Sequence, residues 1–178
     1  MSEKNDAIAL LKADHRKVEG LFEKFEKTKD SRTKTNLVKE ICTELVVHTM
    51  VEEEIFYPAC AGAIEDDTVH EAYVEHDGAK VIIAELLEAS PDNEFYAAKV
   101  KVLSELIKHH VHEEEQRSEG MFAQAREAGL DIEQLGQQIA QRKEQLLADF
   151  KSGDLPAPQT RSFTGHHLRQ GEPVSANA

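Results

Sequence analysis

The 178-residue chain lacks tryptophan and has few of the residues that mark β-rich, disulfide-bonded or membrane-spanning proteins. Aromatic residues make up only 6% of it, with 9 glycines and 5 prolines, while strong helix formers such as alanine, leucine and glutamate are frequent. Two cysteines, Cys42 and Cys60, are too few for a disulfide framework. No run of about 18 consecutive apolar residues is present, which excludes a membrane span. The composition predicts a helical protein.

Positive charge is scarce as well. Lysine and arginine number 21 against 34 aspartates and glutamates, a formal charge of −13. An acidic surface repels phosphate backbones, so no nucleic-acid partner is expected. The first residues, MSEKNDAIALLKADH, show neither the apolar segment nor the cleavage site of a secretory signal. We therefore expect a cytoplasmic protein with reduced thiols and no membrane partner.

Helix start and stop signals divide the chain. Capping residues, prolines and glycines cluster at Thr28–Ser31, Tyr57–Asp67, Ser90–Asn93 and Ala128–Asp131. They delimit four long helices, over about 4–28, 31–60, 66–89 and 92–127, and a shorter fifth over 131–150. From Lys151 on, the chain holds three of the five prolines and almost no periodic apolar residues, so 151–178 is predicted to be a disordered tail.

The predicted helices carry a repeated stripe of apolar residues in steps of three and four, which places the stripe on one helix face. In the first and third helices a histidine occupies the third position, at an offset of 61 residues. In the second and fourth helices the stripe changes from aliphatic residues to His-xxx-Glu, at an offset of 62. The stripes are Ile8, Leu11, His15, Val18, Phe22, Phe25; Val38, Ile41, Leu45, His48, Glu52, Ile55; Val69, Ala72, His76, Ala79, Ile83, Leu86; and Val100, Leu103, Ile107, His110, Glu114.

Each half of the chain is therefore predicted to form a helical hairpin, and the two halves share the same pattern. Two such hairpins predict an all-α, antiparallel up-down four-helix bundle over residues 1–150, including the short fifth helix. In this bundle four histidines and two glutamates meet at one level of the core. Burying them without partners costs several kcal/mol per charge, and no lysine or arginine lies near them on the stripes.

Two metal cations would satisfy all six groups at once. His-xxx-Glu supplies two ligands one helical turn apart, and imidazole with carboxylate favours Fe, Mn or Zn over Mg or Ca. By symmetry each metal takes two histidines and shares both glutamates, which leaves about two open positions on a six-coordinate iron. Open positions favour small-molecule chemistry over a structural site. The predicted ligands are His15, His48, Glu52, His76, His110 and Glu114.

A second register remains open in the fourth helix. His109-xxx-Glu113 has the matching offset of 61, but it would place Lys99 on the inner face. The register of His110 and Glu114 keeps the aliphatic residues inside and is preferred.

Other candidates have simpler explanations. His112 is expected to face solvent, and both cysteines are expected to be packing or surface residues. Tyr73, one turn before His76, could reach an open metal position, although filling the space beside Ala72 is the favoured interpretation. The pair His166-His167 lies in the predicted tail without a scaffold.

Together these residues resemble the hemerythrin HHE cation-binding family. The resemblance covers about residues 7–150 and includes a C-terminal helix with Arg142-Lys143. It is carried by Asp14-His15, His48-xxx-Glu52 followed by Glu53-Glu54-Ile55-Phe56-Tyr57-Pro58, Glu75-His76, and His110-xxx-Glu114-Glu115.

The resemblance implies a non-haem di-iron centre with an oxo or hydroxo bridge, so two Fe ions are the expected cofactor, ahead of Zn or Mn. Members of the family carry or sense dioxygen, react with nitric oxide or peroxide, or handle iron. We expect this chain to bind or react with O2, NO or H2O2 in a stress response or in sensing. The alternative is an iron sensor, or an iron donor for iron–sulfur repair without turnover. No catalytic residue is assigned, and a monomer or homodimer is expected.

Two positions depart from the oxygen-carrying members. Those proteins have a fifth histidine where this chain has Ala72, and an aspartate where it has Glu114. Reversible oxygen transport is therefore not the expected function.

Overall fold

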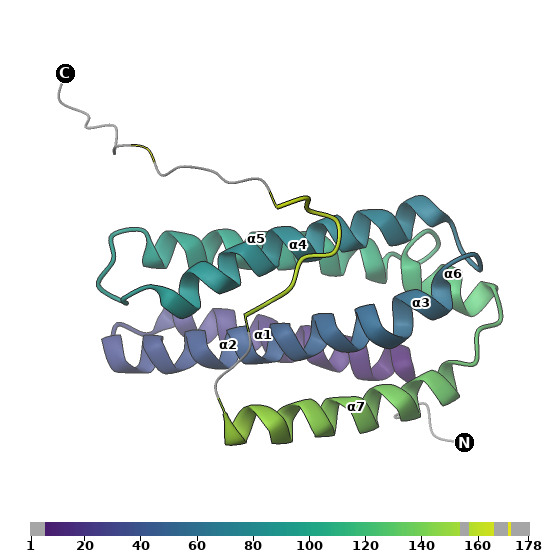
Figure 1. Cartoon of the computed structure of the whole chain (residues 1–178), viewed down its shortest axis with the longest axis horizontal. Helices are drawn as coiled ribbons and strands as arrows, with labels where there is room; N and C mark the ends of the chain where they lie inside the picture. Colours follow the sequence, from purple (N-terminus) through teal and green to yellow (C-terminus); the bar gives the residue numbers. More distant parts are fainter. Residues whose placement is uncertain (1–5, 154–156, 166–170, 172–178) are drawn as a thin grey trace.

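The structure, a computed structural model, describes residues 6–153, 157–165 and 171. The described residues form an all-helical protein without strands, built on an antiparallel four-helix bundle as predicted. Its long helices are α1 (Ala7–Lys27), α2 (Ser31–Val51), α4 (Asp66–Glu88) and α5 (Tyr96–Glu115). Helices α1 and α2 pair as one hairpin and α4 and α5 as the other (Figure 1).

Aspartate side chains fix where several helices begin. Asp6 accepts from the backbone N–H of Ala9 at 2.7 Å, and Asp30 accepts from that of Thr33 at 2.7 Å. Asp131 does the same at the start of α7 (Ile132–Ser152). Each such cap stabilises a helix by about 1 kcal/mol. The predicted helix starts at 31, 66 and 131 agree with the structure within one residue.

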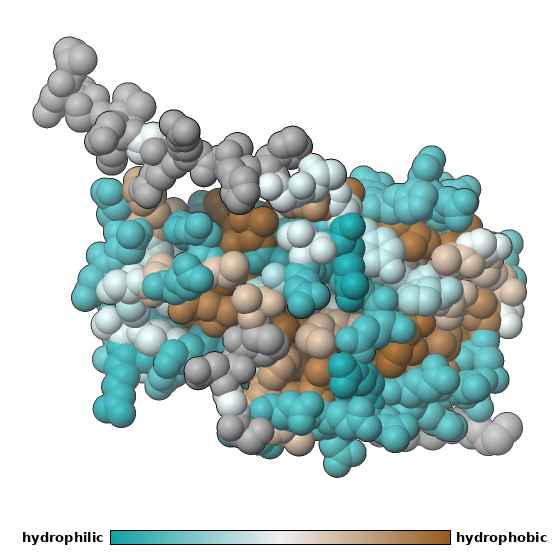
Figure 2. Space-filling view, viewed as in Figure 1, coloured by the Kyte–Doolittle hydropathy of each residue, from teal (hydrophilic) through white to brown (hydrophobic). Residues whose placement is uncertain are grey.

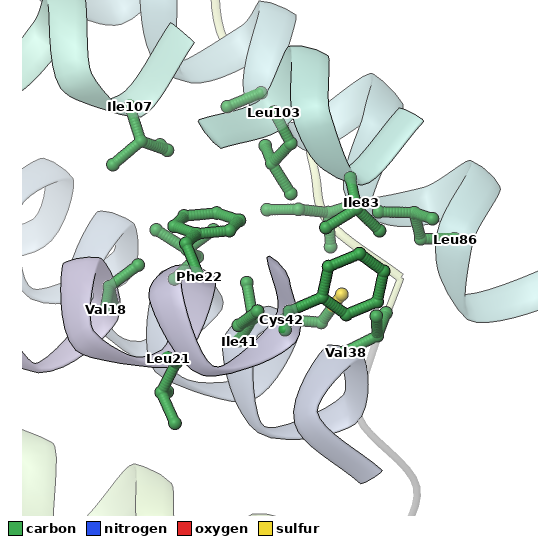
Figure 3. Packing of buried hydrophobic residues seen from close by; sticks show 14 of the residues in the cluster. Val18, Leu21, Phe22, Val38, Ile41, Cys42, Ile83, Leu86, Leu103 and Ile107 are labelled. Carbon is green, nitrogen blue, oxygen red and sulfur yellow. The ribbon is translucent and has the colours of Figure 1, made fainter. Parts of the chain in front are cut away.

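The predicted stripes form the core, in two apolar clusters on either side of the polar layer. One cluster holds the C-terminal half of α1, the N-terminal half of α2 and the facing parts of α4 and α5. There Leu103 and Ile107 extend toward Phe22 and Ile41 of the opposite hairpin (Figure 3). The other cluster gathers Leu11, Val47, Phe56 and the end of the bundle. The metal-ligating level predicted from the sequence therefore lies between two apolar clusters.

The predicted single helix over 92–127 is wrong. Helix α5 begins at Tyr96 and ends at Glu115, and a separate helix, α6 (Met121–Glu127), follows it. The cause is the tight turn at Gly120, where an added Cβ would lie 2.6 Å from the backbone nitrogen of Gln116 and 2.7 Å from the carbonyl oxygen of Glu114. The turn folds α6 back over the end of the bundle.

Helix α2 also departs from a straight helix to residue 60. After Val51 the chain forms a π-helical turn, η2 (Glu52–Phe56), and then the short α3 (Tyr57–Cys60). A π turn takes more residues than an α turn, so the buried face moves on by one position. Phe56 and Tyr57 are fully buried, whereas the predicted stripe residue Ile55 is only half-buried.

Helix α7 confirms the predicted fifth helix and packs across α1 and α2, with Ile139 and Leu146 buried. About half of the predicted disordered tail lies outside the described residues. Its described part, however, crosses α4 (yellow in Figure 1), and Arg161, Ser162 and Phe163 hydrogen-bond to Asp77. These three residues are therefore held on α4 and are not disordered as predicted, because the buried carboxylate of Asp77 accepts hydrogen bonds from their backbone. Among the described residues, none of the helices combines the length and the apolar composition that a membrane span requires.

Candidate metal centre

The six predicted ligands come together in one buried layer, each with at most 4% of its surface exposed. His15 comes from α1, His48 from α2, His76 from α4 and His110 from α5. The Nε2 atoms of His15 and His48 lie 3.1 Å apart, and so do those of His76 and His110. Two imidazoles bound at about 2.1 Å and at right angles to one metal would place their nitrogens about 3.0 Å apart. Both pairs have this separation.

The two glutamates lie between the histidine pairs. Glu52 Oε2 is 3.1 Å from His48 Nε2 and 3.3 Å from His76 Nε2. Glu114 places Oε2 3.4 Å from His15 Nε2 and Oε1 3.6 Å from His110 Nε2. Each carboxylate therefore contacts one histidine of each pair, as a bridging ligand would.

The donor set fits two cations. Glu52 Oε1 and Glu114 Oε2 are buried without any hydrogen-bond partner among the described residues. A buried oxygen in this condition costs about 1–3 kcal/mol, more if it is charged. The ligand atoms fall into two groups within 4.8 Å of one another: His15, His48, Glu52 and Glu114, and Glu52, His76 and His110.

The two registers in α5 differ sharply in burial. The side chain of His109 is 60% exposed and lies 3.1 Å from Glu75, outside the layer. His110 and Glu114 are buried in it, whereas Glu113 is half-buried and His112 is exposed. The geometry favours the preferred register, although metal binding by the six residues stays a prediction.

Each histidine also meets a carboxylate on its outer side. His15 Nδ1 lies 2.8 Å from Glu115, and His110 Nδ1 lies 2.7 Å from Glu75. His76 Nδ1 lies 3.0 Å from Glu53, and His48 Nδ1 lies 3.6 Å from Asp14. A carboxylate on the outer nitrogen fixes the ring and its tautomer, and directs the Nε2 lone pair inward.

Cations hold most of these outer carboxylates in turn. Arg16 binds Glu115, Lys143 binds Asp14, and Lys80 and Arg161 bind Glu53. Burial alone would raise the pKa of Glu115, but hydrogen bonds from His15 and Arg16 lower it to about 2. The same balance lowers the pKa values of Asp14, Glu53 and Glu75. These four groups are therefore carboxylates at neutral pH. Glu115, Glu53 and Glu75 lie within hydrogen-bond distance of an Nδ1 atom, whereas Asp14 faces His48 at the longer distance of an ion pair.

Without a metal, protons on the histidines balance the charge of the buried glutamates. Burial lowers the pKa of His48, but Glu52 and Asp14 outweigh it and raise that pKa to about 10. The pKa of His110 is likewise raised, chiefly by Glu114 and Glu75 against burial. The pKa of Glu52 is well below its usual range, because His48 and His76 overcome the opposing effect of burial. The layer is built for positive charge.

Tyr57 is a member of the layer that the apolar stripes did not reveal. Its hydroxyl lies 3.0 Å from His76 Nε2 and donates to Glu114 Oε1 at 3.1 Å. Burial and the nearby glutamates raise its pKa well above the usual value. The π turn brings Tyr57 inward, and the sequence signal for it is its place in the run Glu53–Pro58, which carries part of the family resemblance. Tyr73, the residue considered instead, is half-buried and packs edge-on against the Tyr57 ring.

A small cavity adjoins the layer on the side of the first apolar cluster. It measures about 10 Å³ and is lined by all four histidines with Val18, Leu45 and Ile107 among its apolar walls. This is room for about one water-sized molecule. A ligand entering from this side must be small and tolerate apolar walls.

The two cysteines are not part of the layer. Cys42 and Cys60 are free and buried, and burial raises the pKa of each thiol to about 12, as expected of packing residues. His166 and His167 lie outside the described residues.

Comparison with known proteins identifies the class. The hemerythrin HHE cation binding domain matches residues 6–122. The chain belongs to the hemerythrin HHE cation-binding family. The sequence is also 26% identical over 106 residues to a DNA nickase of Nostoc sp. strain PCC 7120, a match that covers 60% of this chain and 30% of that protein.

A similar fold occurs in the crystal structure of a hemerythrin HHE cation binding domain-containing protein from Mycobacterium kansasii. The TM-score is 0.67 at 23% identity, covering 83% of this chain and 93% of that one. This similarity concerns the fold alone. The chain spans less than a third of the Nostoc relative, whose activity belongs to the whole of that protein.

Proposed function

We propose that the chain is a non-haem di-iron protein that binds or reacts with O2, NO or H2O2. The observation that carries the proposal is the layer of four histidines with two glutamates between them, in which a buried oxygen of each glutamate lacks a partner among the described residues. His15 and His48 would hold one iron, and His76 and His110 the other. Glu52 and Glu114 would bridge them.

The bound irons would supply electrons and open coordination positions for a small ligand. The chain's own residues orient and protect that chemistry. The outer carboxylates hold the imidazole rings, and the Tyr57 hydroxyl offers a proton or an oxygen donor beside His76. The apolar cavity excludes bulk water and limits the ligand to a few atoms. Iron is favoured over Zn because the proposed chemistry needs a redox-active metal, and over Mn because the family resemblance implies iron.

Metal analysis and absorption spectra test this proposal. Purified protein is expected to carry about two irons per chain, and His48→Ala or Glu52→Ala should lower that number. His109→Ala is the matched control, because its exposed ring lies outside the layer. A near-ultraviolet band that dithionite bleaches would support iron, whereas a colourless zinc-loaded protein would contradict it.

The docked tail favours a second candidate, an iron sensor or donor without turnover. Arg161 contacts Glu53, which contacts His76, so a signal has a path from the layer to the surface. Protein that holds two irons but consumes no O2, NO or H2O2 would point to this function. The Nostoc relative does not extend the proposal to DNA, since a formal charge of −13 opposes phosphate binding.

A further inference from the structure

The segment Arg161–Ser162–Phe163 binds a single buried carboxylate on α4. The backbone N–H groups of all three residues donate to Asp77, at 2.9, 2.6 and 3.0 Å from its Oδ2. The Ser162 hydroxyl donates to the same oxygen at 2.8 Å. We call these three residues the clasp. Four donors on one carboxylate define a specific docking site for the tail.

Asp77 depends on this segment. Its side chain is fully buried, and within the body of the bundle Lys80 reaches it at 3.2 Å. Four charge-assisted hydrogen bonds hold the clasp on Asp77, so docking stabilises both the segment and the carboxylate.

The docking places the Arg161 side chain against the metal layer. Arg161 Nε donates to Glu53 Oε2 at 3.1 Å, while Glu53 Oε1 lies 3.0 Å from His76 Nδ1. Asp77, next to His76 in the chain, holds the backbone of the clasp, and Glu53 holds its side chain. Two adjacent contacts thus connect the tail to one histidine.

The described part of the tail contacts the surroundings of only one of the two histidine pairs. The carboxylates behind His15 and His48 are paired with Arg16 and Lys143, which belong to α1 and α7. The carboxylate behind His76 takes one of its two cations from the tail. Loss of the clasp should therefore disturb the His76–His110 group and leave the His15–His48 group intact.

We infer that the clasp is a positioning element of the metal centre: Arg161 orients His76 through Glu53, so that clasp docking and metal binding at His76 and His110 favour each other. The inference rests on the proposed metal binding, and it does not depend on which small molecule reacts. Because such coupling is reciprocal, metal loading should also hold the clasp more firmly on Asp77.

The test uses Co(II) as the bound metal, in the full-length chain, with an excess of chelator. Wild type should release two Co(II) ions in two phases. Arg161→Ala should accelerate one phase about 3- to 10-fold, near the low end of outer-shell effects because Lys80 still holds Glu53. Asp77→Asn should act on the same phase, and Arg161→Lys should restore most of the retention.

The matched control is Arg142→Ala. Arg142 binds Glu54 at 2.7 Å, in the same π turn as Glu53, but Glu54 pairs with none of the four histidines in the part of the chain that the structure describes. This variant should release Co(II) as wild type does. Trypsin cleavage after Arg161 gives an independent readout, because the N–H of Ser162 is held by Asp77. Cleavage should be slower with Co(II) bound and faster in Asp77→Asn.

Equal release from wild type and Arg161→Ala would overturn the inference, and so would acceleration of both phases together. A wild-type chain that holds no Co(II) would overturn it along with the proposed metal site. A third outcome separates the two proposals. If the clasp substitutions accelerate one phase of Co(II) release, but the iron form reacts with neither O2, NO nor H2O2, the inference is supported and the proposed reactivity is contradicted.

Discussion

The two ring nitrogens of each histidine in the layer have different partners. The Nε2 atoms meet in pairs at 3.1 Å, and the Nδ1 atoms face carboxylates on the outside. A neutral ring that donates from Nδ1 must carry its lone pair on Nε2. The arrangement therefore selects the tautomer that binds a metal, and Tyr57 adds an oxygen to the same layer.

Tyr57→Phe tests the part that the hydroxyl plays. The substitution keeps the packed ring and removes the group 3.0 Å from His76. We expect metal affinity at His76 and His110 to fall about 10-fold, as for the loss of other polar partners at a metal site. Calorimetric metal titration would measure it. Tyr73→Phe serves as the control, and equal affinity in both variants would assign Tyr57 to packing alone.

The metal-free protein should lose stability as the pH rises. His48 has a pKa of about 10 in the folded chain and about 6.5 when unfolded. Its contribution is therefore complete below pH 6.5 and is lost as the pH rises toward 10. Urea unfolding in the presence of a chelator, at pH 6 to 10, would measure this slope. His48→Gln should flatten it, and a slope unchanged in that variant would show that other groups cause it.

At the scale of elements, periodicity determined what could be predicted. The stripes identified the long helices and the four histidines and two glutamates of the layer, because a buried helix face repeats every three to four residues. The π turn at Glu52–Phe56, the break at Gly120 and the clasp have no period. Tyr57 and Arg161 were missed for this reason: their positions depend on one irregular turn and on one buried aspartate.

Gly120→Ala should damage the site from outside it. The new Cβ would meet backbone atoms at 2.6–2.7 Å, so the end of α5 must move, and Glu114 and Glu115 move with it. We expect a loss of about 1–3 kcal/mol in the free energy of unfolding, together with lower metal content. Chemical denaturation and metal analysis would check both.

Gly20→Ala is the matched control for that experiment. Gly20 lies in the middle of α1, and within the described chain a Cβ added there would meet no atom within 4 Å outside its own helix backbone. Replacing a helical glycine by alanine there should stabilise by about 0.5–1 kcal/mol. If the two variants behave alike, the turn at Gly120 is more tolerant than its contacts imply.

At the scale of the whole molecule, the two halves of the repeat are covered differently. Helix α7 packs on α1 and α2 and supplies Lys143, whereas the clasp reaches α4 and supplies Arg161. The face that carries the clasp is largely hydrophilic, with smaller apolar groups between (Figure 2). The layer itself is nearly symmetric, but different elements cover its two halves. We therefore expect the His15–His48 pair and the His76–His110 pair to differ in metal affinity.

The last prediction concerns the reaction with oxygen. The chain has Ala72 at the position where the oxygen-carrying members that it resembles have a further histidine, and the Tyr57 hydroxyl lies 3.0 Å from His76 Nε2. A reduced centre with few nitrogen ligands and a nearby proton donor favours complete oxidation over reversible binding. We expect the anaerobically reduced protein to oxidise on exposure to O2 and to stay oxidised after purging with argon, as followed by absorption. Return of the reduced spectrum without added reductant would contradict this and make oxygen carriage the leading function.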